Sequence, residues 1–444
     1  MAKEWIGNLI AQLRAGKISR REFAQRAGAL GLSATMIGQA MRVAPAAAQD
    51  ASPAAGGEQV GMAGIPHMTD TSQGTIKIYS SWPMIAANEQ LGGDMRESAV
   101  LAFEDFGNAA GGFAIEYEAL DDAIASTGNW DPGKEAENAN RAVNDADAMV
   151  YIGTYNSGAA AISIPILNQA DPGPMPMISP ANTYPGLTQA VEGVTEEGEP
   201  DKYYPTGTRN YMRNTVADHL QAGAQVNWAI NTQGYQTAYV LHDNELYGQG
   251  LAIAFDLYFK KYGGEVLGFE GFTRDAPDFQ SLATSIADKA PDIVLVSTVA
   301  TNNPGKVVKD LRSVMPPDEV AILGPDGLFN VAYIEAAGEE GEGTYVTFGG
   351  VPPRFLESPI GLDWAQRMEE RLGHAPDAYA IYSYDAAVIA MQAIDQVQAK
   401  DRVAILEAML NTKEFNGLSG SYSFTATGDP DKPSIFLGQV TAGD

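Results

Sequence analysis

Two loops that carry hydroxyl side chains each follow a short apolar segment. The first follows the run 148–152 and contains Ser157; the second follows the run 175–179 and contains Thr183. Such runs predict buried parallel strands, and open α/β sheets bind ligands beyond the carboxyl ends of their strands. Hydroxyls and free N–H groups at a helix start suit a small anion such as a carboxylate. Ser157 and Thr183 could equally be ordinary helix caps.

A lone carboxylate, Asp326, stands between a proline and a glycine after the predicted strand 320–323. At a strand end it could face a cationic group of a ligand. The alternative is a turn-forming aspartate bonded to its own backbone. Three aromatic residues at other element ends could wall an apolar pocket or could belong to the core or rim: Trp82, Tyr247 and Tyr379.

The sequence offers little catalytic chemistry. It contains no nucleotide-binding glycine loop, no GxSxG elbow and no HExxH motif. It has no cysteine and only four histidines without paired spacing, so we expect no disulfide, no metal site and no cofactor. The adjacent acids Asp121 and Asp122 point apart on a strand end, and we expect a solvated or hinge-lining pair. A net charge of −28 argues against nucleic acid as a partner.

The N-terminal segment has the order of an export signal. Arg20 and Arg21 form a twin-arginine pair, followed by the apolar run 27–41 and by small residues that end at Ala48. This pattern predicts a Tat-type signal over residues 1–48 and export across the cytoplasmic membrane. The alternative is a short amphipathic helix with a chance arginine pair. Residues 49–74, rich in Ala, Gly, Ser and Pro, predict a flexible linker.

Strand and helix patterns alternate along the rest of the chain. A strand over 75–80 and a helix over 94–106 begin a series typical of a doubly wound parallel sheet. Residues 191–205 are acidic and aperiodic, and predict a crossing to a second lobe. The alternation restarts with the strand 237–242. A chain of 444 residues also exceeds one hydrophobic core, so two lobes are expected.

Several segments, taken in their order and spacing, resemble the type I periplasmic solute-binding proteins of ABC importers. The similarity is to the branched-chain amino-acid (leucine/isoleucine/valine) group and covers about residues 75–440. The segments that carry it are Tyr151-Ile152-Gly153 with Ser157, the stretch 177–183, Leu241-His242-Asp243 with 247–250, and 323–327.

The resemblance implies two Rossmann-like α/β lobes joined by a three-crossover hinge. Lobe 1 would comprise residues 75–205 plus 348–419, and lobe 2 residues 206–347 plus 420–444. It implies a monomer that closes on a small amino acid, or a related carboxylate or amide, and delivers it to a membrane ABC permease.

The resemblance also implies roles for single residues. Ser157 and Thr183 would bind the ligand carboxylate. The Ala181 carbonyl, the Thr183 hydroxyl and the Asp326 carboxylate would hold the ammonium, although an aspartate has a shorter reach than the glutamate frequent in the family. Tyr247 and Tyr379 would wall the side-chain pocket. The segment 81–84 departs from the usual Gly/Ser-rich turn, and the wider group also includes binders of amides, urea and aromatic acids.

Two other classes of function are considered. A ligand-sensing receptor module shares this fold but is normally fused to a membrane span or signalling domain. An exported enzyme on a Rossmann-like scaffold would need a nucleotide loop, a metal cluster or an activated nucleophile. The sequence shows a better inventory for binding than for catalysis.

Overall fold

The computed structural model describes residues 67–441. The predicted signal 1–48 and most of the predicted linker lie outside the described residues. The rest of that linker, residues 67–74, is bonded to the protein: the Met68 N–H donates to Asp395 (2.8 Å) and the Gln73 N–H to the Gly112 carbonyl (2.9 Å). The flexible linker predicted to end at residue 74 is therefore wrong for these last residues.

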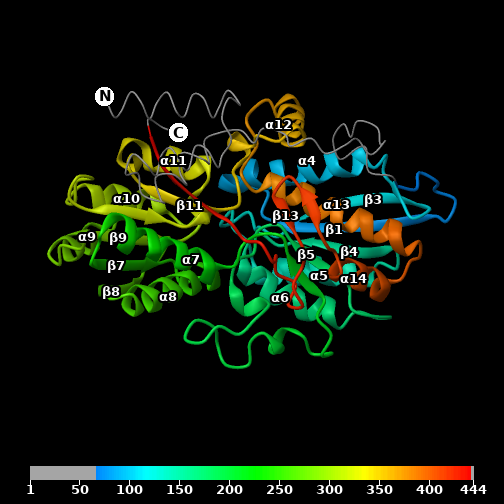
Figure 1. Ribbon diagram of the computed structural model, residues 1–444, viewed down its shortest axis with the longest axis horizontal. Coiled ribbons are helices and arrows are strands. Elements are labelled where there is room, and N and C mark those ends of the chain that lie inside the picture. The colour runs from blue at the N-terminus through cyan, green and yellow to red at the C-terminus, as the bar shows by residue number, and fades with distance from the viewer. Residues whose placement is uncertain (1–66, 442–444) are drawn as a thin grey trace, which may run out of the picture. The chain divides into compact units, whose positions relative to one another are not determined.

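The first sheet forms the centre of lobe 1 (Figure 1). Its strands are parallel except β2, which runs antiparallel to β3. In spatial order they are β2 (Ala109–Ala110), β3 (Phe113–Asp121), β1 (Thr75–Trp82), β4 (Ala148–Gly153), β5 (Met177–Ser179) and β6 (Tyr211–Arg213).

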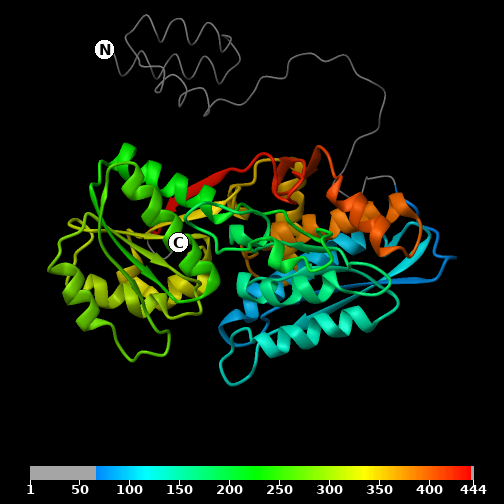
Figure 2. The ribbon, with the colours of Figure 1, turned by 90° about the horizontal axis from the view of Figure 1, so that it is seen from below.

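Helices cover both faces of this sheet because its side chains alternate between two apolar clusters. Ile76 and Ile78 of β1 belong to a cluster with α4 and α13, whereas Tyr79 belongs to one with α5 and α6. Figure 2 shows the cyan α5 and α6 on the opposite side of the blue strands from the orange α13 and α14. The helices are α4 (Glu89–Asp105), α5 (Pro132–Asn144), α6 (Ser157–Asn168), α12 (Pro359–Leu372), α13 (Ala380–Val397) and α14 (Arg402–Leu410).

Local sequence explains where several of these helices begin. The Asp131 side chain accepts hydrogen bonds from two N–H groups at the start of α5, and Asp401 does the same for α14. Ser358 caps α12 through the Gly361 N–H. These are the residue types that satisfy the free N–H groups of a first helical turn.

The second sheet forms the centre of lobe 2. Its strands are parallel except β14, which runs antiparallel to β11. In spatial order they are β14 (Ile435–Gln439), β11 (Tyr345–Gly349), β10 (Ala321–Gly324), β9 (Ile293–Ser297), β7 (Thr237–His242) and β8 (Glu265–Gly271). A separate hairpin joins β12 (Phe415–Gly417) to β13 (Gly420–Tyr422).

The helices of lobe 2 also divide between two faces. Val240 and Leu295 pack in the cluster that contains residues of α7 and α8, whereas Tyr239 and Val294 pack in the cluster that contains residues of α9, α10 and α11. The helices are α7 (Asp218–Asn227), α8 (Leu246–Lys261), α9 (Gln280–Ala287), α10 (Pro304–Arg312) and α11 (Val331–Ala337). The predicted fold class, two doubly wound and mostly parallel sheets, is confirmed.

Strand pairing corrects the predicted lobe boundaries. β6 pairs with β5, so lobe 1 continues to Arg213 and the boundary at 205/206 is too early. The boundary at 347/348 falls inside β11, and the boundary at 419/420 divides the β12–β13 hairpin. The chain passes between the sheets three times: after β6, after β11 and before β14.

The predicted crossing at residues 191–205 is instead a loop packed on lobe 1. Tyr203 and Tyr204 are buried in the same cluster as Tyr151 of β4. The buried Glu199 accepts hydrogen bonds from Tyr184 (2.7 Å) and Tyr203 (2.7 Å). These tyrosine donors satisfy the buried carboxylate, so the acidic segment can pack against lobe 1.

Asp122 is another correction, since it is fully buried rather than solvated. It lies beside Glu135 of α5, which accepts hydrogen bonds from Ser81 (2.5 Å) and Tyr151 (2.9 Å). Burial, and then the charge of Glu135, raise the pKa of Asp122 well above its usual value; burial also raises the pKa of Glu135 to about 7. Desolvation disfavours the charged form of each acid, so this core retains a proton.

This buried proton makes stability depend on pH. Above the ordinary carboxyl pKa of 4.5 the unfolded chain has lost a proton that folded Glu135 still holds, so the free energy of unfolding falls as pH rises toward about 7. The contribution of Glu135 is about 3 kcal/mol. Glu135→Gln should flatten the fall measured by urea unfolding across this range. Glu137→Gln, at an exposed position of the same helix, is the control; an unchanged slope in Glu135→Gln would contradict the assignment.

Candidate ligand-binding site

The two hydroxyl-bearing loops lie side by side at the carboxyl ends of β4 and β5. The Asn182 side chain joins them, because its Nδ2 donates to the Tyr155 carbonyl (2.9 Å) and its Oδ1 accepts from the Thr154 N–H (3.3 Å). Ser179 adds a bond from its hydroxyl to the Thr154 carbonyl (2.9 Å). The loops are therefore held in one arrangement before any ligand is present.

Arg213 holds the second loop from behind. Its guanidinium is fully buried and donates to the carbonyls of Asn182 (2.9 Å) and Tyr184 (3.0 Å). It also lies 2.9 Å from the carboxylate of Asp429. Because Arg213 ends β6, at the first crossover, the charge that fixes the loop also fixes the start of the hinge.

Asp326 receives hydrogen bonds from residues of two helices and from the residue just before a third. Its Oδ1 accepts from Gln221 Nε2 (2.7 Å) of α7 and Tyr247 Oη (2.6 Å) of α8, and its Oδ2 accepts from Tyr379 Oη, immediately before α13. Burial raises the pKa of Asp326, and these three donors oppose the rise. Tyr379 belongs to lobe 1, so this interaction joins the lobes.

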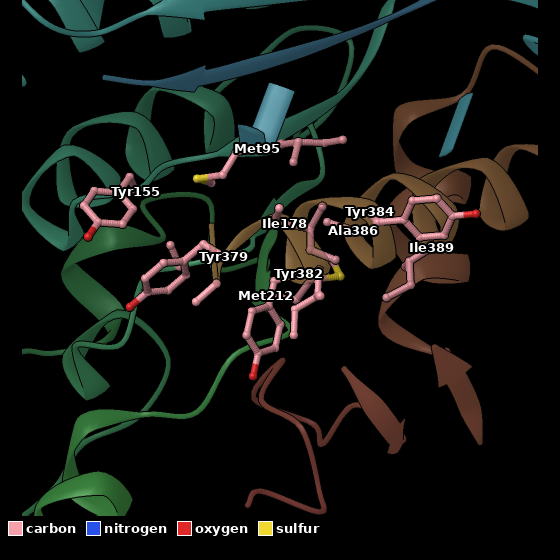
Figure 3. Packing of buried hydrophobic residues seen from close by; sticks show 14 of the residues in the cluster. Met95, Tyr155, Ile178, Met212, Tyr379, Tyr382, Tyr384, Ala386 and Ile389 are labelled. Carbon is pink, nitrogen blue, oxygen red and sulfur yellow. The ribbon is translucent and has the colours of Figure 1, made fainter. Parts of the chain in front are cut away.

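Tyr379 lies where an aromatic cluster meets this polar site. Figure 3 shows Tyr155 and Tyr379 near each other, with the rings of Tyr382 and Tyr384 farther along α13. The rings of Tyr155 and Tyr379 meet edge to face with centroids 5.3 Å apart. Packing thus fixes the Tyr379 ring, and its hydroxyl can bond to Asp326 with little loss of side-chain freedom.

Five of the seven predicted site residues line one small cavity: Ser157, Ala181, Tyr247, Asp326 and Tyr379. Tyr155, Asn156, Val299 and Gly327 complete its wall. The enclosed space is about that of a single water molecule. An amino acid would therefore need the lobes to separate before it could enter.

The other two predicted residues lie elsewhere. Trp82 is fully buried in the lobe 1 core and its indole N–H donates to the Gly92 carbonyl (3.0 Å), so its prediction as a pocket wall is wrong. Thr183 is buried near the cavity without lining it, and its carbonyl accepts from the Asp218 N–H (2.8 Å). A hydroxyl role for Thr183 remains a prediction.

Asp218, Gln221 and Tyr155 also surround the site, but they were not predicted from the sequence. Asp218 and Gln221 stand three residues apart near the start of α7 and so share one face of that helix. An acid and an amide at this spacing were the only hint in the sequence that this helix face could contribute to a polar site. They became informative only when strand pairing placed the crossover directly before α7.

A larger cavity of about 520 Å³ shares no lining residue with the small one, although Leu328 and Ala378 in its wall adjoin Gly327 and Tyr379 in the chain. Its wall is mostly apolar and includes Phe329, Val331, Val346 and Pro353. We place the candidate site at the small cavity, because the hydroxyls, N–H groups and carboxylate converge there.

The sequence pattern of the periplasmic binding protein family matches residues 75–444. The chain belongs to the periplasmic binding protein family. The match covers both sheets and all three crossovers. The predicted resemblance is therefore confirmed for the family.

Individual proteins are similar to this chain in sequence or in fold. The leucine-, isoleucine-, valine-, threonine- and alanine-binding protein of Pseudomonas aeruginosa is 24% identical over 357 residues, 80% of this chain and 87% of that protein. The leucine-binding protein LivK of Thermotoga maritima superposes with a TM-score of 0.72 at 24% identity, covering 83% and 97% of the two chains. A solute-binding protein of R. palustris in complex with benzoate superposes with a TM-score of 0.68 at 21% identity, covering 83% of this chain and 94% of that one. These structures show the shared fold.

Within residues 67–441, no helix combines the length and apolar character needed to cross a bilayer.

The hydrogen bond from Tyr379 to Asp326 should shift the equilibrium between open and closed lobes toward the closed form. Tyr379→Phe removes a hydrogen bond to a carboxylate across the lobes, which should weaken the closed state by about 1.5–3 kcal/mol. The radius of gyration in X-ray scattering, measured without ligand, should rise. Tyr384→Phe is the matched control, because its hydroxyl bonds to Asp105 within lobe 1. Equal scattering from both variants would contradict the role of Tyr379 in closure.

Proposed function

We propose that this protein is the extracytoplasmic solute-binding component of an ABC importer. It binds a small amino acid, or a related carboxylate, between its lobes and delivers it to a membrane permease. The observation that carries the proposal is the convergence of groups from both lobes on one cavity: Ser157 and Ala181 from lobe 1, and Tyr247 and Asp326 from lobe 2. The named ligands of the relatives support the same class of small molecule.

The proposed roles follow the chemistry of a zwitterion. Ser157 and Thr183, with neighbouring N–H groups, bind the ligand carboxylate. The Ala181 carbonyl, the Thr183 hydroxyl and the Asp326 carboxylate hold the ammonium. Tyr247 and Tyr379 wall the site and share the Asp326 carboxylate with the ligand. Charge-assisted bonds in such a water-poor site are worth about 1.5–3 kcal/mol each.

Several further properties belong to the proposal. The protein acts as a monomer, is a binder rather than an enzyme, and requires no cofactor. The absence of a catalytic motif from the sequence supports a binding role over an enzymatic one. In the described residues, no group of three or more His, Asp or Glu side chains has the arrangement of a metal site.

The first test concerns the ammonium. By calorimetry, Asp326→Asn should weaken binding of leucine about 10- to 100-fold, because one charge-assisted bond is lost. Binding of 4-methylpentanoate, which is leucine without its amino group, should change little. Asp275→Asn, at an exposed site in lobe 2, is the control. Equal losses for both ligands would reject the Asp326 role, and no binding of small amino acids or aromatic carboxylates would reject the function.

The second test concerns export. Replacing Arg20 and Arg21 by lysines should stop export of the full chain, because the proposed signal depends on the arginine pair. Cell fractionation would then find the protein in the cytoplasm, with its signal still attached. The control variant carries Lys3→Arg and Arg14→Lys, two equally conservative changes in the same segment. Unchanged export of the Arg20/Arg21 variant would reject the Tat route.

A further inference from the structure

A second buried carboxylate lies beside Asp326. Asp218, the first residue of α7, is fully buried, and neither of its carboxylate oxygens makes a well-formed hydrogen bond within residues 67–441. Its backbone N–H donates to the Thr183 carbonyl (2.8 Å). The Thr183 hydroxyl also lacks a well-formed bond in this part of the chain. The Thr183 hydroxyl still acts on this carboxylate as a neutral donor that lowers its pKa. Burying a carboxylate with only a poorly formed bond is costly, so its retention calls for a stronger partner.

The fold brings Asp218 to the proposed ammonium site. Gln221, one turn farther along α7, donates to Asp326 (2.7 Å) and accepts from the Asp326 N–H (2.9 Å). Asp218 lies on the same helical face, next to the Thr183 loop of lobe 1. Burial, and then the charge of Asp326, raise the pKa of Asp218 well above its usual value. Asp218 therefore stands between Thr183 and Asp326, the two residues already assigned to the ammonium.

The groups around this pair cannot neutralise both acids. Tyr247 of α8 and Tyr379 before α13 are neutral donors, and burial raises the pKa of each well above its usual value. Tyr155, in the β4–α6 loop, is also kept neutral by burial, which raises its pKa. Asp377, whose pKa burial raises to about 7, adds no positive charge.

Cationic groups on the hinge side are already used. Arg213 of β6 lowers the pKa of Asp218, but it acts less strongly than burial, Asp326 or Thr183. Its guanidinium is bonded to the Asn182 loop and paired with Asp429. Burial lowers the pKa of the adjacent His219, which favours its neutral form. Burial and their mutual repulsion both disfavour ionising the two carboxyls together, so the pair holds a proton.

We propose that Asp218 and Asp326 form a proton-exchange site, in which the ammonium of the bound amino acid replaces a proton held by one of the two carboxyls. This rests on the proposed function and adds Asp218 as a second anionic contact of the ligand. One carboxyl O–H bond breaks and its proton passes to water or buffer. The ligand ammonium then donates N–H bonds to both carboxylates, so one positive charge enters as another leaves.

The exchange fixes the sign of the pH dependence. While the free pair is protonated, the proton competes with the ammonium, so affinity for an amino acid rises with pH until the ligand amine itself loses its proton. Binding releases up to one proton per ligand over that range. A carboxylate without an ammonium leaves the pair protonated, so its affinity lacks this rise. The same pair would thus favour cationic amines over deaminated analogues.

The experiment is calorimetry of leucine binding in two buffers that differ in heat of ionisation, at several pH values. The wild type should release close to one proton, and its affinity should rise about tenfold for each pH unit while the free pair is protonated. Asp218→Asn should bind leucine with little proton release, because Asp326 alone is stabilised as a carboxylate by its three donors. Asp275→Asn should behave as the wild type does, and 4-methylpentanoate should release no proton from either protein.

The outcomes separate the two levels of the proposal. If leucine binds without proton release, or if Asp218→Asn releases as many protons as the wild type, the exchange is refuted while the binding function stands. If no amino acid binds the wild type, the proposed function fails and the exchange fails with it. Infrared difference spectra of the wild type give a test independent of the variant's folding: leucine should remove the band of a protonated carboxyl, and an unchanged band refutes the exchange.

Discussion

Burying the carboxylate of Asp326 is the constraint on which the arrangement of the site depends. A charge without partners in a protein interior is strongly unfavourable. Here Gln221, Tyr247 and Tyr379 supply the partners, and they come from α7, α8 and the segment before α13. Since Tyr379 belongs to lobe 1 and Asp326 to lobe 2, the need to satisfy one carboxylate also holds the lobes together.

The same residues give the site two states with similar chemistry. In this closed form the Tyr247 and Tyr379 hydroxyls donate to the Asp326 carboxylate, and the cavity has room for about one water. An ammonium can take over part of that role only if the lobes first separate. Closure around a ligand then changes the free energy little, because hydrogen bonds from the tyrosines are exchanged for bonds from the ligand.

The two loops of lobe 1 that carry site residues are held by hydrogen bonds from Arg213 and Asn182, which do not line the cavity. Arg213 fixes the loop that carries Ala181 and Thr183, and Asn182 fastens that loop to the one before α6. These bonds join residues of lobe 1 only, so separating the lobes does not require breaking them. Preorganisation of this kind lowers the entropy lost when a ligand is ordered.

The sequence by itself determined the strand-end loops, the family and most of the residues around the cavity. Apolar runs that end at Gly or Pro mark buried strands wherever they occur, so Ser157, Ala181 and Asp326 could be placed at a sheet edge without coordinates. Only the tertiary structure decided where the lobes meet. β6 joins the first sheet through three residues of pairing, a signal too short to read from periodicity.

The same limit explains the errors. Trp82 follows a strand as a pocket aromatic would, but packing turned its indole toward Gly92 and the core. Asp218 and Gln221 look like ordinary polar residues of a helix start, because their burial depends on η6 (Asp326–Leu328), more than a hundred residues away in the chain. Local pattern determines which groups stand at the ends of elements. Long-range packing determines which of those groups are desolvated, and desolvation gives the acids of this site their chemistry.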